Sequence, residues 1–187
     1  EFLGWSLFRH EDVTRVLLDH ETFSNAVSKH LSVPNGMNPP EHTAYRRIIE
    51  PYFSTERMAT FEPVCREIVT KLVRDLLARN EVEFMADAAL PFAELVQCAF
   101  LGWPAELHGR LATWTRKNHA ATLAQDRQAM SEIALEFEDL VDHLLETRLQ
   151  AGTNVETDLT TALMNEKVWG RDLSNEELAS ILRNWTV

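Results

Sequence analysis

One short stretch of the chain, residues 42–47, combines residue types that bind anions with helical spacing. An interval of four places His42 and Arg46 on one face of a helix, about one turn apart. Both side chains can then donate hydrogen bonds to one carboxylate or phosphate, and the planar Arg fork grips a carboxylate in two places. The alternative is that both residues are solvated on a helix surface. Spacing alone leaves both interpretations open.

Other local motifs of catalysis are absent from the sequence. It contains no GxSxG, HExxH, GxxxxGK[ST] or GxGxxG, and the spacing of its seven histidines selects no triad. Cys65 and Cys98 lie among apolar residues at helical spacing, without a Cys or His neighbour at a zinc-site interval. We therefore predict two buried thiols and no metal site, and local motifs identify no catalytic residue in this chain.

The charge of the chain excludes some partners. A net charge of -11 disfavours nucleic acid and anionic membranes, because binding to phosphates depends on clustered Lys and Arg. No uninterrupted apolar stretch approaches the roughly 18 residues of a membrane span, and residues 1–5 lack the pattern of a signal peptide. The sequence therefore predicts a cytoplasmic protein that binds neither nucleic acid nor membrane.

The elements that would position the 42–47 segment begin with a predicted brief strand at residues 3–8 and a helix at 12–19. Residues 22–40 are rich in Ser, Asn, Pro and Gly and predict an irregular connection. Asn38-Pro39-Pro40-Glu41 is a strong helix start, in which Asn38 can cap and proline fits the first helical position. This helix should run to about Glu50, before Pro51.

The rest of the chain is predicted to be mainly helical. Apolar residues at steps of three and one indicate a long amphipathic helix over 61–77 with a wide buried stripe. Residues 82–85 read as a possible strand. Further helices are expected at 92–101 (mostly buried, ended by Gly102), 107–123, 133–149 (stopped by Gly152) and 159–164. Ser174 and Glu177 have the spacing of a capping box, and the helix that they open is interrupted by the end of the chain at Val187.

Three ordered motifs together resemble the cytochrome P450 family of soluble bacterial enzymes. Residues 11–24 are similar to the family's helix B and its following turn, and residues 38–47 resemble the start of helix C, usually written DPPEHTxxRR. Residues 174–178 resemble the LSDEEL that opens helix I. The resemblance implies a mainly α, incomplete cytochrome P450 fold, from helix B to the start of helix I, with minor β strands. Residues 1–187 would form one partial domain, truncated at both ends, without a second domain.

The resemblance also implies roles for particular residues. His42 and Arg46 match the two helix C residues that contact a haem propionate, which is the kind of anion their spacing suits. Arg47, on another face, would belong to the surface that meets an acidic ferredoxin or flavoprotein reductase, or would be a solvated charge. The segment 26–37 matches the loop that covers the substrate. Its candidate apolar contacts are Val27, Leu31 and Val33, which could instead simply pack.

The last helix departs from the family, because Arg183-Asn184-Trp185 replaces a stretch that is usually aliphatic. Polar groups there could face the substrate pocket or the entry to the oxygen site, or could pack ordinarily. Asn184 and Val187 are therefore candidate substrate contacts.

The implied activity of the longer protein is insertion of one oxygen atom of O2 into a small apolar organic substrate, with haem b as cofactor and electrons from the redox partner. The family's cysteine ligand to iron lies outside this chain, so we expect the chain alone to be inactive, free of tightly bound haem and prone to self-association. Two alternatives are a non-enzymatic helical ligand-binding or regulatory domain, and a naturally shortened relative.

Overall fold

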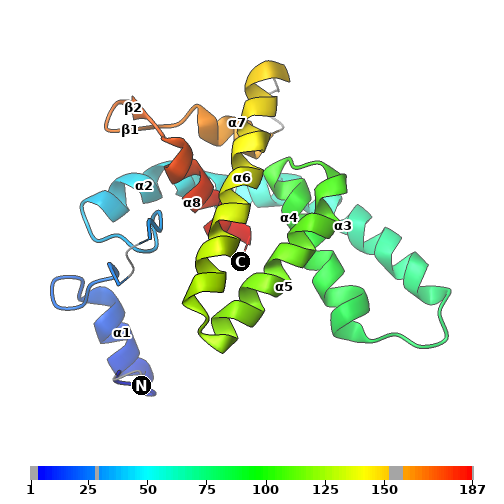
Figure 1. Cartoon of the computed structure of the whole chain (residues 1–187), viewed down its shortest axis with the longest axis horizontal. Helices are drawn as coiled ribbons and strands as arrows, with labels where there is room; N and C mark the ends of the chain where they lie inside the picture. Colours follow the sequence, from blue (N-terminus) through cyan, green and yellow to red (C-terminus); the bar gives the residue numbers. More distant parts are fainter. Residues whose placement is uncertain (1–3, 28–29, 152–157, 187) are drawn as a thin grey trace.

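Helices dominate the structure, a computed structural model that describes residues 4–27, 30–151 and 158–186 (Figure 1). The α-helices are α1 (His10–Leu18), α2 (Glu41–Ile49), α3 (Thr55–Leu77), α4 (Leu90–Leu101), α5 (His108–Ala124), α6 (Arg127–Ala151), α7 (Leu159–Met164) and α8 (Asn175–Thr186). Short 3-10 turns, η1 (Glu50–Phe53) and η3 (Ala105–Leu107), and a π-helix, η2 (Phe84–Ala89), join them. The mainly helical prediction is confirmed.

The core lies where α5, α6 and α8 meet. The long α6 crosses the molecule beside α8, and α5 packs along it (Figure 1). Phe137 and Val141 of α6 are fully buried, one helical turn apart, as is Ile181 of α8. The indole of Trp114 packs 4.6 Å from the Phe137 ring, and its N–H donates to the Ile133 carbonyl at 2.8 Å. This polar contact lets a large aromatic residue occupy the core without an unpaired donor.

The helix predicted to begin at Pro39 is α2, which begins two residues later, at Glu41. The capping role predicted for Asn38 is wrong. Its side-chain oxygen accepts from the backbone N–H of Asn25 at 3.0 Å, and its amide donates to Ser24 at 2.7 Å. Asn38 therefore fastens the preceding irregular segment instead of the helix start.

Two predicted strands are wrong. The described part of the first, residues 4–8, has no regular structure and is exposed to solvent. The second, residues 82–85, gives way to η2, because the Glu83 carboxylate accepts hydrogen bonds from the backbone N–H groups of Met85 and Ala86. A side chain that satisfies the free donors of a first turn favours a helix start, and short apolar runs do not distinguish strand from helix.

The long helix predicted over 61–77 is α3, but its apolar stripe is not buried. None of the 23 residues of α3, all of them described, is buried, and Val69, Val73 and Leu77 are 37%, 46% and 79% exposed. Cys65 on the same stripe is only half-buried, so the prediction of a buried thiol is wrong there. The sequence of α3 carries an apolar stripe, but no described element of the structure fully covers it.

The predicted helix 92–101 is α4, which ends at Gly102 in the left-handed conformation (φ 70°). Cys98 and Leu101 are buried, whereas most of its other residues are only partly covered. Among the described residues, Phe84–Leu101 is long and apolar enough to cross a membrane, with a mean hydropathy of 1.4. It carries Asp87 and Glu94 and packs against α3 and α5, and such composition is weak evidence by itself.

The region before the last helix is compact. Helix α7 is where it was predicted, whereas Gly152, the predicted stop of α6, lies outside the described residues. Strands β1 (Lys167–Val168) and β2 (Arg171–Asp172) pair antiparallel across a two-residue turn, Trp169-Gly170, with positive φ at both positions. The hairpin carries the chain from α7 to the start of α8, beside α2 (Figure 1).

Candidate functional site: the exposed face of the second helix

Helix α2 presents the two predicted anion-binding residues one turn apart on its surface. The His42 side chain is half-buried and has no hydrogen bond or ion pair within the described residues. The Arg46 side chain is 44% exposed, and its Nε and Nη2 donate to Oε1 of Glu50 at 3.2 and 3.0 Å. The guanidinium therefore already holds a carboxylate, and Nη1 stays available for a second anion.

Arg47 points to a different part of the surface. It is exposed, without an ion pair to any described residue, and it lines a shallow hollow with Pro39, Thr43 and Trp169. The neighbouring hairpin supplies Trp169, whose indole is 61% exposed. The prediction that Arg46 and Arg47 serve different faces of α2 is compatible with this arrangement and remains untested.

A partly buried polar cluster that was not predicted fixes the orientation of α2. Tyr45, on the inner side of α2, donates its hydroxyl hydrogen to Oε1 of Glu177 in α8. Arg171 of β2 grips the same carboxylate in two places, at 2.7 and 2.8 Å. Arg171 and the hydrogen bond from Tyr45 lower the pKa of Glu177 to about 2, against the effect of burial.

The same carboxylate closes the predicted capping box. The backbone N–H of Ser174 donates to Oε2 of Glu177 at 2.8 Å, and the N–H of Glu177 donates to the Ser174 hydroxyl at 3.2 Å. The capping box is therefore confirmed, but Glu177 does more than cap. Because it also binds Tyr45, it ties the start of α8 to the helix that carries His42 and Arg46.

The residues predicted to contact a substrate are placed in different environments. Val27 is 89% exposed, Leu31 is partly buried against the core, and Val33 is fully buried within it. Asn184 donates from its amide to the Val33 carbonyl at 2.9 Å. Val187 lies outside the described residues. The structure thus brings Leu31, Val33 and Asn184 together and leaves Val27 apart.

A hollow lined mainly by apolar side chains lies between α3, α4 and α8. Phe61 and Phe100 stack edge to face at 5.4 Å, and Phe53 meets Trp185 at 5.2 Å. Gln97 donates to the Trp185 carbonyl near the end of α8. The hollow is apolar apart from Gln97 and Asn184, so it suits an apolar group of a ligand or another part of a protein.

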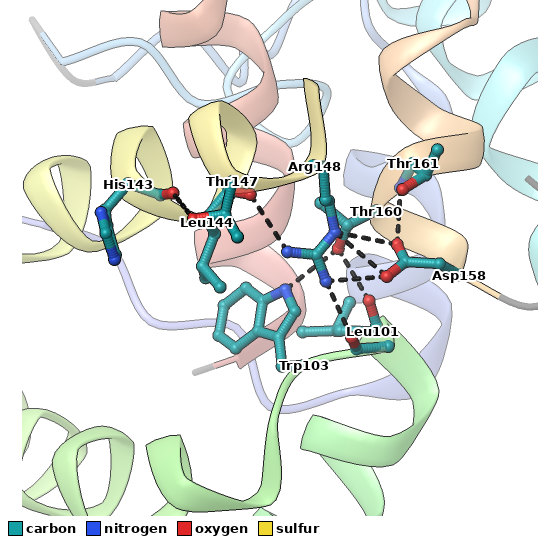
Figure 2. A network of polar contacts seen from close by, with 10 residues as sticks. Leu101, Trp103, His143, Leu144, Thr147, Arg148, Asp158, Thr160 and Thr161 are labelled. Atoms are coloured by element: carbon teal, nitrogen blue, oxygen red, sulfur yellow. Dashed lines mark hydrogen bonds and ion pairs between the residues drawn. The ribbon is translucent and has the colours of Figure 1, made fainter. Parts of the chain in front are cut away.

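A second buried network joins the end of α4 to α6 and α7 (Figure 2). The guanidinium of Arg148 pairs with the Asp158 carboxylate at 2.8 Å, and Nη2 also donates to the Gly102 carbonyl at 2.7 Å. Close by, the Trp103 indole donates to the Thr160 hydroxyl at 3.0 Å. Every charged group has several partners, which suits a structural junction rather than a reactive site.

Neither cysteine is placed to bind a metal. Burial raises the pKa of the Cys98 thiol, which makes the reactive thiolate scarce at neutral pH. In the described ranges, no group of three or more His, Cys, Asp or Glu side chains is arranged to hold a metal ion. The prediction of a buried thiol is confirmed for Cys98.

The arrangement of the helices is that of the cytochrome P450 fold. No family model matches the chain. Nearly the whole chain superposes on about half of a cytochrome P450. The crystal structure of the LnmA cytochrome P450 hydroxylase from Streptomyces atroolivaceus matches with a TM-score of 0.80 at 24% identity, covering 98% of this chain and 48% of that one.

Curated relatives support the resemblance by sequence. The chain is 25% identical to the putative cytochrome P450 YjiB of Bacillus subtilis, covering 93% of this chain and 46% of that protein. It is 28% identical to the erythromycin C-12 hydroxylase of Saccharopolyspora erythraea, covering 94% of this chain and 46% of the relative. The suspected resemblance to bacterial cytochrome P450s is confirmed, and the chain spans about half the length of the curated relatives it matches.

Proposed function

We propose that this chain is part of a haem-thiolate monooxygenase. The longer protein would insert one oxygen atom of O2 into an apolar organic substrate, using electrons from a ferredoxin or a flavoprotein reductase in the cytoplasm. The observation that carries the proposal is the His42–Arg46 face of α2 within a cytochrome P450 fold. The names of the relatives, which include hydroxylases and epoxidases, support the same class of activity.

The residues of α2 fit the carboxylate of a haem b propionate. Arg46 already binds a carboxylate, that of Glu50, and His42 offers an imidazole with no other described partner. A histidine and an arginine one helical turn apart can hold a propionate from two directions, and Arg stays charged at any physiological pH. When bound, haem would supply the oxygen and redox chemistry, and the protein would supply binding and orientation.

The chain's own residues would contribute an anchor, a partner surface and part of a substrate roof. Tyr45 and Glu177 hold α2 on α8, so the anchor is built on two connected helices rather than on a loop. Arg47 is exposed and unpaired within the described residues, which fits contact with an acidic redox protein. The catalytic and iron-binding residues would come from elsewhere in the longer protein.

The test is a spectrum of the full-length protein. Reduced and treated with carbon monoxide, it should absorb at the position that is characteristic of thiolate-bound haem. A correctly folded full-length protein without this band would contradict the proposal and favour a non-enzymatic helical domain or an inactive relative.

A narrower test separates the two arginines. Arg46→Ala should speed the transfer of haem to apomyoglobin, because it removes one propionate contact. Arg47→Ala should leave that rate unchanged and instead slow the reduction of the haem by the partner, because it removes a surface charge. If the two variants behave alike, the assignment of separate faces is wrong.

A further inference from the structure

Three polar side chains of α8 hold the irregular segment that precedes α2. The Ser180 hydroxyl accepts from the backbone N–H of Val33 at 2.8 Å and donates to the Leu31 carbonyl at 3.1 Å. Arg183 donates to the same Leu31 carbonyl at 2.8 Å. Asn184 donates to the Val33 carbonyl at 2.9 Å. The two segments are about 150 residues apart in the sequence, so these are tertiary contacts.

The hydrogen bond from the Val33 N–H to Ser180 is buried, and the other three are partly buried. Val33 is fully buried and Ser180 is 3% exposed, and the Arg183 side chain is 20% exposed. A backbone N–H or carbonyl in such a place must find a protein partner, because water cannot replace it there. The hydrogen bonds from α8 therefore help to hold residues 31–33 in place.

The segment is also held by apolar packing: Val33 is fully buried, and Leu31 and Met37 pack against the core. Its own turn supplies two backbone hydrogen bonds, from Gly36 to the Ser32 carbonyl at 2.7 Å and from Met37 to the Pro34 carbonyl at 3.0 Å. Just before it, Val27 is 89% exposed. The polar residues of α8 thus mark the point at which an exposed, irregular segment becomes fixed to the core.

Arg183 also faces a third element. Its Nη1 lies 3.9 Å from Oε1 of Glu138 in α6. The guanidinium of Arg183, itself part of α8, therefore lies between residues 31–33 and α6. If residues 31–33 moved away from α8, the Arg183 guanidinium would lose its hydrogen bond to the Leu31 carbonyl, and its Nη2 would lack this acceptor.

We infer that Ser180, Arg183 and Asn184 form a latch that sets how far residues 31–33 open, and thereby which sizes of apolar ligand enter. The inference rests on the proposed function, in which residues 26–37 cover the substrate. These three are positioning residues, because they hold the segment. Asn184 also lines the apolar hollow between α3, α4 and α8, so Ser180→Ala is the variant that changes the segment alone. The sequence left two interpretations of the polar residues Arg183 and Asn184, which were contact with the substrate pocket and ordinary packing. We assign both residues to this latch.

Two variants of the full-length protein test the latch. Ser180→Ala leaves the Val33 N–H without its partner, and Asn184→Leu removes the amide at similar volume. The matched control is Asn175→Leu, on the same helix, whose amide donates at 3.2 Å to Asp142 instead. Hydrogen exchange followed by mass spectrometry reports on residues 31–37. Binding of imidazole and of 4-phenylimidazole, followed by absorbance, reports on ligand size.

Both latch variants should exchange the amides of residues 31–37 about tenfold faster, the factor expected for loss of one hydrogen bond of typical net strength. They should also bind 4-phenylimidazole more tightly relative to imidazole, because a looser segment admits the larger ring. Asn175→Leu should change neither quantity.

Unchanged exchange in both variants would overturn the latch. Faster exchange with an unchanged ratio of the two affinities would overturn the link to ligand size. Ser180→Ala keeps the test valid if Asn184→Leu does not fold. If the carbon monoxide spectrum shows no thiolate-bound haem, the proposed function fails, whereas the exchange rates still decide whether the latch exists.

Discussion

Helices α3 and α8 are both amphipathic, yet they lie in opposite environments. Leu178, Ile181 and Leu182 of α8 are at most 4% exposed. Val69 and Val73 of α3 are 37% and 46% exposed, although their stripe has the same period. The period of apolar residues therefore says which side of a helix avoids water, and not whether another element covers that side.

Polar residues account for part of the difference. Helix α8 accepts two buried tertiary hydrogen bonds, from the Tyr45 hydroxyl to Glu177 and from the Val33 N–H to Ser180. The polar contacts of α3 are mostly with itself, as in the Thr60 and Thr70 hydroxyls, which donate to carbonyls four residues earlier. Buried polar contacts specify a particular neighbour, which local contacts cannot do.

The largest expected effect is in the packed region around α6 and α7. Arg148→Met keeps the length of the side chain but leaves the Asp158 carboxylate buried without its partner. We expect the free energy of unfolding to fall by about 3–5 kcal/mol, the usual result of breaking a buried ion pair. Urea denaturation of the full-length protein, followed by circular dichroism, measures this.

Arg116→Met on the exposed side of α5 is the control, and it should change the free energy of unfolding by less than about 0.5 kcal/mol. A similar loss in both variants would mean that the network in Figure 2 has no special part in the packed region.

The second-largest expected effect comes from one leucine-to-alanine substitution made in α8 and one made in α3. Leu182 of α8 is fully buried, and Leu77 of α3 is 79% exposed. Leu182→Ala should cost about 2–5 kcal/mol, because it removes buried methyl groups and leaves a cavity. Leu77→Ala should cost less than about 0.5 kcal/mol. Equal losses in urea denaturation would show that α3 is covered after all.

A smaller effect depends on pH at the start of α8. The pKa of Glu177 is about 2 in the folded protein, below its ordinary value of 4.5. Its stabilising contribution is therefore complete above pH 4.5 and is lost as the pH falls toward 2. Because Arg171 is 51% exposed, we discount this contribution to roughly 2 kcal/mol.

Glu177→Gln should thus be less stable than the original protein at pH 7, and the difference should shrink as the pH falls below about 4.5. Urea titrations at several pH values measure it. Glu176→Gln, an exposed neighbour in the same first turn, is the control. A difference that stays constant down to pH 2.5 would contradict the role of the Glu177 carboxylate.

Features that depend on near neighbours in the sequence were predictable. The capping box of Ser174 and Glu177 was found because its two hydrogen bonds join residues three positions apart. The start of α2 followed from the proline pair. The strand predicted at 82–85 failed because Glu83 was not recognised as the cap of η2.

Features that depend on distant pairs were not predictable from one sequence. Tyr45 lies 132 residues from Glu177, and Trp103 lies 57 residues from Thr160. Nothing in their local spacing points to the partner. His42 and Arg46 could be proposed together as a candidate site because both lie on one helix, whereas the polar stretch at Arg183 and Asn184 was noticed only as a departure from the family's aliphatic pattern.

The smallest effect on stability, and the sharpest test of the comparison, is on α3. Val69→Glu combined with Val73→Lys makes its exposed stripe polar, leaves the net charge unchanged, and places Glu four residues before Lys, which supports a helix. The free energy of unfolding should therefore change by less than about 0.5 kcal/mol.

We expect the 187-residue chain to self-associate through its exposed apolar surface, because exposed apolar patches drive association. The double variant should sediment more slowly at equal concentration, because part of that surface is gone. The control, Thr70→Glu with Arg74→Lys, alters the polar side of the same helix and should sediment like the original chain. Identical sedimentation of both variants, or a compact monomer in every case, would show that the stripe of α3 does not drive association.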